Sequence, residues 1–90
     1  MEFEWDRNKD KINQSKHKVA FREATTVFGD PLAITFDDPD HSDDENRLLT
    51  FGITKTGKLI IVSHTQRNRK LRIISARLVD KNERNIYEEG

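Results

Sequence analysis

Three consecutive segments in the second half of the chain are rich in β-branched and aromatic residues: RLLTFGIT (47–54), LIIVSHTQR (59–67) and KLRIISARLV (70–79). Such residues favour extended strands. The connections at 55–58 and 68–69 are so short that consecutive strands must run antiparallel. The sequence therefore predicts a three-stranded antiparallel meander as the centre of the fold.

Two helices are predicted before this meander. Asp6 can cap a first helix that runs to about Lys16. A second helix is indicated by apolar residues at helical spacing. These residues are Ala20, Phe21, Ala24, Val27 and Phe28. Gly29 followed by Asp30-Pro31 should end this helix, because glycine can adopt the left-handed cap conformation and proline cannot continue a helix.

Shorter elements complete the predicted fold. EFEW (2–5) predicts an edge strand, AITF (33–36) a brief strand, and the acidic residues of 37–45 a mobile polar loop. Asp80 and Glu83 have the spacing of a capping box, which opens a short C-terminal helix. The predicted class is α+β, with an antiparallel sheet, two N-terminal helices and a short C-terminal helix. The second helix should cover one face of the sheet and leave the other partly open to a ligand.

Composition excludes several classes of protein. A length of 90 residues suits one domain spanning 1–90, and the absence of cysteine excludes disulfides and thiolate metal sites. No apolar run approaches the roughly 18 residues of a membrane span, and the acidic start lacks the features of a signal peptide, so we expect a cytoplasmic protein. His17, His41 and His64 lack metal-ligand spacing, although His41 among aspartates could form a weak, nonspecific cation site. No cofactor is expected.

The charge is unevenly distributed. Lys and Arg number 16, as do Asp and Glu, but residues 19–46 hold one basic and eight acidic residues, whereas 47–90 hold ten and four. The basic side chains concentrate in one segment that contains no acidic residue, QRNRKLRIISAR (66–77). They are Arg67, Arg69, Lys70, Arg72 and Arg77. Such a field suits a polyanion, although a solvated hairpin explains the same pattern without a ligand.

A second basic group lies on the first helix. Lys9, Asn13, Lys16 and His17 fall at i, i+4, i+7 and i+8, so helical spacing places them on one face. This face could bind nucleic-acid phosphates. Positive charge at a helix C-terminus also complements the backbone dipole, which is an alternative explanation that needs no ligand.

The hairpin register decides which basic residues share a sheet face. With a two-residue connection at 68–69, Arg67 lies opposite Lys70 and Thr65 opposite Arg72 on one face. His64 then lies opposite Ile73, and Val62 opposite Ser75, on the other face, which Arg77 shares. Whatever the register, Arg72 and Arg77 are five residues apart and should point to opposite faces unless a bulge intervenes.

These residue types suit metal-free RNA cleavage. Histidine can transfer protons near neutral pH, and arginine can bind two oxygens of a phosphorane. Trp5 and Tyr87 could stack on bases, although both are more often packing residues in a small domain. A domain that binds nucleic acid without cutting it fits the same residues.

The sequence also resembles a known family, the BrnT-type ribonuclease toxins of bacterial type II toxin-antitoxin modules. The resemblance is carried by FEWDRNKDKINQSKHKVAFREATTVFGDP (3–31) and, downstream, by Arg47, Gly52, Gly57, Thr65, Arg67, RIISAR (72–77), Glu83-Arg84 and Tyr87. It implies a RelE-like fold and metal-independent RNA cleavage. We expect this cleavage to proceed by attack of the 2′-hydroxyl and to inhibit translation and growth. The resemblance further implies neutralisation, in a hetero-oligomer, by an antitoxin whose ribbon-helix-helix part binds operator DNA, so that the toxin meets this DNA only through the antitoxin. Lys18 departs from the pattern, because the family usually has a small residue such as glycine there.

The sequence leads to specific site assignments. Arg67 and Arg77 are the expected phosphate and phosphorane contacts, with His64 or His17 transferring protons. RNA binding is expected from Lys16, Lys9, Arg72 and Lys70. The alternative is a non-catalytic module that binds its antitoxin and contributes to operon repression, since the same arginines could contact acidic partner residues.

Overall fold

A computed structural model describes residues 1–39 and 46–89 of the chain. Its elements, in chain order, are β1 (Glu2–Glu4), α1 (Arg7–His17), α2 (Phe21–Ala24), the 3₁₀ helix η1 (Thr25–Gly29), β2 (Ile34–Asp37), β3 (Leu48–Ile53), β4 (Leu59–Arg67), β5 (Lys70–Leu78) and α3 (Lys81–Glu89). This order agrees with the prediction. The predicted cation site at His41 and most of the predicted polar loop lie outside the described residues.

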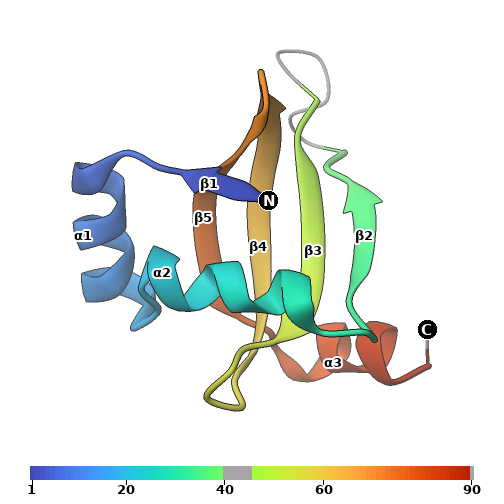
Figure 1. Ribbon diagram of the computed structural model, residues 1–90. Helices are drawn as coiled ribbons and strands as arrows, with labels where there is room; N and C mark the ends of the chain where they lie inside the picture. The colour runs from blue at the N-terminus through green and yellow to red at the C-terminus, as the bar shows by residue number, and fades with distance from the viewer. Residues whose placement is uncertain (40–45, 90) are drawn as a thin grey trace.

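The strands form one sheet in the order β1-β5-β4-β3-β2, with α2 and η1 crossing one face (Figure 1). The meander from β3 to β5 is antiparallel, as predicted. The prediction of a wholly antiparallel sheet is wrong at the edge, because β1 pairs with β5 in parallel. No tight turn joins these two strands, so local sequence does not fix their relative direction. The class is α+β, and the RelE-like label stays a prediction.

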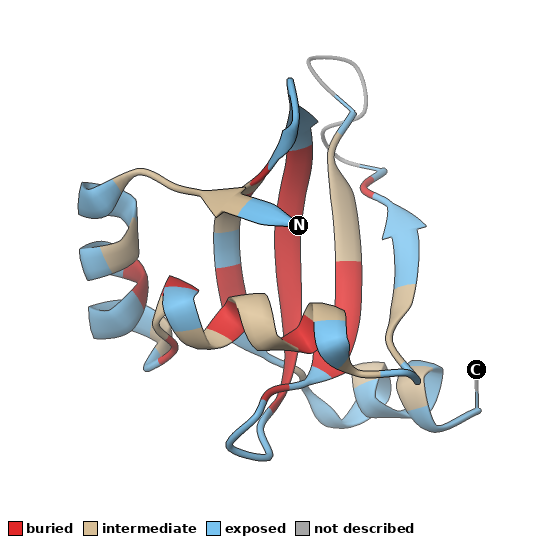
Figure 2. Ribbon diagram, in the orientation of Figure 1, coloured by how far each residue is buried: buried red, intermediate tan, exposed pale blue. Residues whose placement is uncertain are grey.

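The core lies between the helices and one face of the sheet (Figure 2). Its fully or nearly buried members come from the α1–α2 joint, α2, η1, β4 and β5. They are Val19, Phe21, Ala24, Val27, Ile60, Val62, Leu71, Ile73 and Ala76. We call the sheet face beneath α2 and η1 the core face and the opposite one the outer face. Because side chains alternate along β4, Ile61, Ser63 and Thr65 point to the outer face.

The second helical segment changes type halfway. A single α-helix was predicted, but α2 gives way to η1 at Thr25. The hydroxyl groups of Thr25 and Thr26 each donate at 2.7 Å to a carbonyl three residues earlier, and such bonds compete with the regular helical pattern. The helical segment ends at Gly29 as predicted, but Gly29 does not take a positive φ angle.

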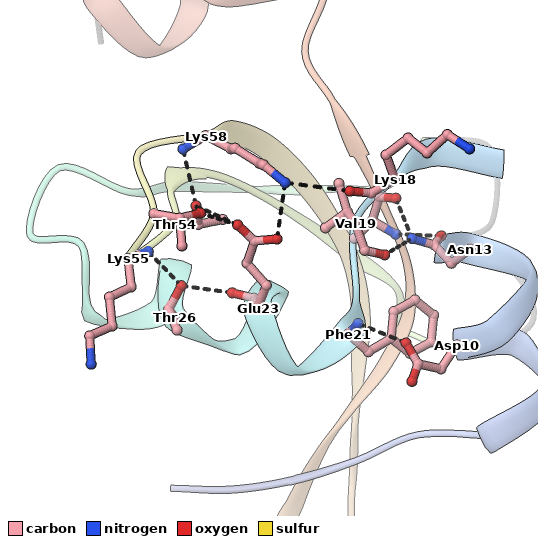
Figure 3. Close-up of polar contacts among 12 residues, drawn as sticks. Asp10, Asn13, Lys18, Val19, Phe21, Glu23, Thr26, Thr54, Lys55 and Lys58 are labelled. Carbon is pink, nitrogen blue, oxygen red and sulfur yellow. Dashed lines mark hydrogen bonds and ion pairs between the residues drawn. The ribbon is translucent and has the colours of Figure 1, made fainter. Parts of the chain in front are cut away.

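A polar cluster ties α2 to the β3–β4 turn (Figure 3). The Glu23 carboxylate accepts hydrogen bonds from the hydroxyls of Thr54 and Thr56. It also forms an ion pair with the Lys58 ammonium at 3.4 Å. The Thr56 hydrogen bond is the main reason why the pKa of Glu23 lies below its usual value. The Lys58 ammonium also lies 3.5 Å from the Lys18 carbonyl oxygen, so one lysine links the turn to the α1–α2 joint.

The connection between α1 and α2 (18–20), called the α1–α2 joint above, contains a residue with a strained backbone. Lys18 has φ 61° and ψ 28°, the left-handed conformation that a glycine would adopt most easily. Its backbone N–H donates to the Gln14 carbonyl at 3.0 Å, which closes α1. The departure from the family pattern therefore leaves the left-handed cap in place and puts a side chain on it.

Replacing Lys18 with glycine should raise the free energy of unfolding by about 0.5–1 kcal/mol, because relief of the left-handed strain outweighs the greater freedom of glycine in the unfolded chain. Chemical denaturation measures this. Lys18→Ala is the matched control, since it removes the same ammonium contact to the Ser15 carbonyl but keeps a Cβ. A glycine variant no more stable than the alanine variant would contradict the expectation.

Candidate functional site

A β-bulge shapes the basic hairpin. The predicted pairs Arg67 with Lys70, Thr65 with Arg72 and His64 with Ile73 are confirmed. The predicted partner of Val62 is wrong, because Val62 lies opposite Ala76 and not Ser75. The register shifts between Ser63 and His64, which leaves one extra residue in β5.

The predicted placement of Arg77 on the face of His64 is wrong, because this bulge brings Arg72 and Arg77 to the same side of the sheet. Arg72 lies opposite Thr65 and Arg77 opposite Ile61, and these two β4 residues are separated by an even number of positions. Both arginines therefore lie on the outer face, with Arg67 opposite Lys70 at the hairpin end. We call this set the strand face: Arg67, Lys70, Arg72, Ser75 and Arg77.

The strand face is long compared with one phosphate group. Arg67 and Ile61, the β4 partner of Arg77, are six residues apart, which corresponds to about 20 Å of extended strand. Arg67 and Arg77 thus do not converge on one phosphate. Ser75 lies between Arg72 and Arg77, two residues from the latter, so these three residues can act on one stretch of a ligand.

Arg72 and Arg77 of the strand face each hold a carboxylate from the described part of the chain. Arg72 lies 2.8 Å from Glu4 of the neighbouring β1, and both side chains are partly exposed. Arg77 contacts Glu83 of α3 through two nitrogens, at 2.6 and 2.8 Å. The hydrogen bonds of this pair lower the pKa of Glu83 and raise that of Arg77. Both groups therefore stay charged, and Arg77 on the outer face already binds the two oxygen atoms of one carboxylate.

The basic face of α1 borders the strand face. A hollow of about 200 Å³ lies between α1 and β5. Its lining residues are Lys9, Ile12, Asn13, Lys16, His17, Ile74 and Ser75, and we call it the α1 hollow. The predicted grouping on one helix face is confirmed. Ser75 belongs to both the α1 hollow and the strand face, so it marks where the two surfaces meet.

Asn13 fixes α1 against β5. It is buried, with 5% of its surface exposed. Its side-chain amide donates at 2.8 Å to the carbonyls of Val19 and Ala76, and its oxygen accepts the Ala76 N–H at 3.1 Å. The pairing of β1 with β5 stops at Arg72. Asn13 therefore occupies the place of a strand partner further along β5. Its predicted place on one helix face with Lys9, Lys16 and His17 did not indicate this role.

His64 lies away from the arginines. It is on the core face with 4% of its surface exposed, its ring edge-on to Phe28 at 5.0 Å between centroids. Its Nε2 lies 2.7 Å from the Thr50 hydroxyl, which in turn lies 2.8 Å from that of Thr35. Burial lowers the pKa of His64 to about 4. His17, in contrast, lines the α1 hollow beside Ser75, so of the two histidines in the described residues it is the one that lies at the basic surfaces.

The neutral His64 should make stability depend on pH. Its pKa is lower in the folded chain than the ordinary 6.5, so protons bind the unfolded chain more tightly. The free energy of unfolding should therefore be roughly 2–3 kcal/mol lower at pH 4.5 than above pH 6.5. The pKa values of Glu23 and Glu83 are lowered from 4.5, so these carboxylates contribute below this window. Denaturant unfolding at both pH values measures the loss, and His64→Gln should show less of it. Equal losses in both proteins would contradict this account.

The remaining candidates serve packing. The Trp5 ring is edge-on to Phe21 at 6.3 Å, and the Tyr87 hydroxyl donates to the Asp30 carboxylate at 2.7 Å. These contacts agree with the alternative that both aromatic residues are structural. Among residues 1–39 and 46–89, no cluster of three or more His, Cys, Asp or Glu side chains could hold a metal ion. No helix in the same ranges has the length and apolar character needed to cross a membrane.

Comparisons with known proteins agree with the sequence resemblance. The family model that describes the ribonuclease toxin BrnT of type II toxin-antitoxin systems matches residues 5–83. Among solved structures, the Brucella abortus ribonuclease toxin BrnT is similar, with a TM-score of 0.71 and 23% identity over 90% of this chain and 99% of that chain. At this identity the likeness shows the fold alone. No curated protein matches the sequence.

Proposed function

Because this chain belongs to the BrnT family of ribonuclease toxins of type II toxin-antitoxin systems, we propose that it cleaves RNA bound along the strand face. The observation that carries this proposal is the junction at Ser75. There the bulge aligns Arg72 and Arg77 on the outer face, and the α1 hollow adds Lys16 and His17. No other surface in the described part of the chain gathers so many of the predicted residues.

The proposed roles follow from position. Arg67 and Lys70, at the hairpin end, bind the RNA backbone away from the cleaved bond, together with Lys9 and Lys16 beside α1. Arg77, near Ser75, contacts the phosphorane, since its planar fork matches two phosphate oxygens. Arg72 supports the neighbouring phosphate when RNA displaces Glu4.

His17 is the proposed proton-transfer group, because it lies at the α1 hollow whereas His64 is buried on the core face. It removes the proton of the 2′-hydroxyl, and the resulting oxygen attacks phosphorus. The bond to the 5′ oxygen breaks, this oxygen takes up a proton from water, and His17 returns the proton that it removed to solvent. The products are a 2′,3′-cyclic phosphate and a 5′-hydroxyl, and the reaction as proposed needs no metal ion.

Membership of a type II family implies an antitoxin partner. We expect it to neutralise the toxin by covering the strand face and to carry a ribbon-helix-helix part that binds operator DNA. The pairs Arg72 with Glu4 and Arg77 with Glu83 favour this surface as a binding site for carboxylates. They also keep the second candidate function open, a non-catalytic module that only binds antitoxin. Expression alone in a bacterium separates the two, since only the ribonuclease should stop growth.

Incubation of purified protein with end-labelled RNA in EDTA tests the proposal. Wild-type protein should produce fragments with cyclic phosphate and 5′-hydroxyl ends, and Arg67→Ala/Arg77→Ala should not. Arg22→Ala/Lys55→Ala is the charge-matched control, because both of its residues are exposed and lie outside the strand face and the α1 hollow. Intact RNA with folded wild-type protein, or equal cleavage by the Arg67→Ala/Arg77→Ala variant, would refute the proposed site.

A further inference from the structure

Among residues 1–39 and 46–89, the hydrogen bonds of Arg77 leave one edge of its guanidinium free. A guanidinium carries five N–H donors. Three of them are used: Nη1 donates to Glu83 at 2.8 Å and to the Leu78 carbonyl at 3.3 Å, and Nη2 donates to Glu83 at 2.6 Å. The two donors left are Nε–H and the second Nη2–H. In the planar group they point the same way and form a fork that fits two oxygens of one phosphate.

Glu83 is itself held in place by the start of α3. Its Oε1 accepts the Asp80 N–H at 3.0 Å, and its own N–H donates to the Asp80 carboxylate at 2.8 Å. This is the predicted capping box. The carboxylate that holds Arg77 thus belongs to a closed pair of bonds at a helix terminus, and its side chain is only 22% exposed. A loosely held surface glutamate would not restrict the guanidinium in this way.

We infer that Glu83 is a positioning residue for RNA cleavage, which directs the free Nε/Nη2 edge of Arg77 toward the phosphorane. The inference rests on the proposed function. A freely rotating arginine would have to be ordered in the transition state, whereas Arg77 held by Glu83 is ordered beforehand. Glu83 therefore acts on the rate of the chemical step through Arg77 and does not contact RNA.

Electrostatics alone gives the opposite expectation. Glu83 brings a negative charge close to the RNA, so its removal should strengthen binding and leave or raise the rate. A purely structural role as a helix cap would lower stability without a specific effect on the rate at saturating RNA. The three roles are therefore separable by measuring kcat, KM and thermal unfolding together.

The first test is Glu83→Gln. Glutamine still accepts the Asp80 N–H and so keeps the capping box, but it replaces one carboxylate oxygen by an amide that cannot accept from Arg77. We expect kcat for RNA cleavage in EDTA to fall about 10-fold, with KM unchanged or lower. Glu88→Gln is the matched control, since it makes the same charge change on an exposed part of α3 and should keep the wild-type kcat.

The second test places Glu83→Gln in an Arg77→Lys background. A lysine has no second donor edge to orient, so Glu83→Gln should lower kcat no further there, although any effect on thermal unfolding should persist. An unchanged kcat in the single variant, or equal losses in both backgrounds, would overturn the inference while the wild type still cleaves. Absence of cleavage by folded wild-type protein would overturn the proposed function and this inference with it.

Discussion

Replacing Arg77 with alanine should lower the rate of RNA cleavage at saturating RNA by about 100-fold or more. Removal of one preorganised donor to the charge of a transition state typically has an effect of this size. The loss should appear mainly in kcat, because Arg67 and the lysines of the strand face and α1 still hold the RNA backbone. Single-turnover cleavage of labelled RNA in EDTA measures it.

Arg22→Ala is the control for this substitution. Arg22 is an exposed arginine of α2, which covers the core face, so its loss changes the net charge equally without touching the strand face. Arg77→Ala also removes a partly exposed ion pair, but such pairs contribute only about 0–1 kcal/mol to stability, so the protein should remain folded. Cleavage within a few fold of wild type by the Arg77 variant would show that Arg77 does not contact the phosphorane.

The largest effect on stability is expected from Asn13→Asp, a loss of about 3–4 kcal/mol in the free energy of unfolding. The change replaces the amide donor with an oxygen 2.8 Å from the carbonyls of Val19 and Ala76. Buried acceptors would then face one another, or a buried carboxyl would have to take up a proton. In a chain of this size the loss should lower the melting temperature by at least about 10 °C.

Gln14→Glu makes the same chemical change at the neighbouring, exposed position of α1, so it should remain within about 0.5 kcal/mol of wild type. Denaturant unfolding compares the two variants directly. If Asn13→Asp unfolds within 1 kcal/mol of wild type, Asn13 does not hold α1 against β5. The α1 hollow would then need another explanation for its position beside Ser75.

Local patterns were sufficient to predict most elements of the fold. The β4 strand has the predicted bounds, because its branched residues end at turns on both sides. Asp6 caps α1 through the N–H groups of Asn8 and Lys9, and the capping box of Asp80 and Glu83 is formed. Each of these features depends on residues that are close in the sequence.

The features that were missed depend on distant residues. The parallel pairing of β1 with β5 joins residues far apart in the chain, and no local sequence pattern marks the bulge in β5 opposite Ser63 and His64. Asn13 carries no local signal for its bonds to Ala76, which lies on a distant strand. The positive charge of the basic segment could be predicted from the sequence. The position of Arg72 and Arg77 on the same sheet face could not, because it requires this bulge.

The chemistry of the histidines was also beyond the sequence. Their type suggested proton transfer, but the burial of His64 under Phe28 and its contact with Thr50 result from the packing of η1 on the sheet. The sequence placed His64 on the face opposite Arg67, and the structure agrees. His17 could be distinguished from His64 only once the α1 hollow was seen.

An NMR titration tests most directly where RNA binds. Amide chemical shifts of the labelled wild-type protein are followed as RNA is added. The 2′-hydroxyls of this RNA are methylated, so that it cannot be cleaved. We expect the largest shifts along Arg67–Arg77 and at Lys16 and His17, with little change in α2. Shifts confined to α2 and η1, with the strand face unperturbed, would contradict this binding site.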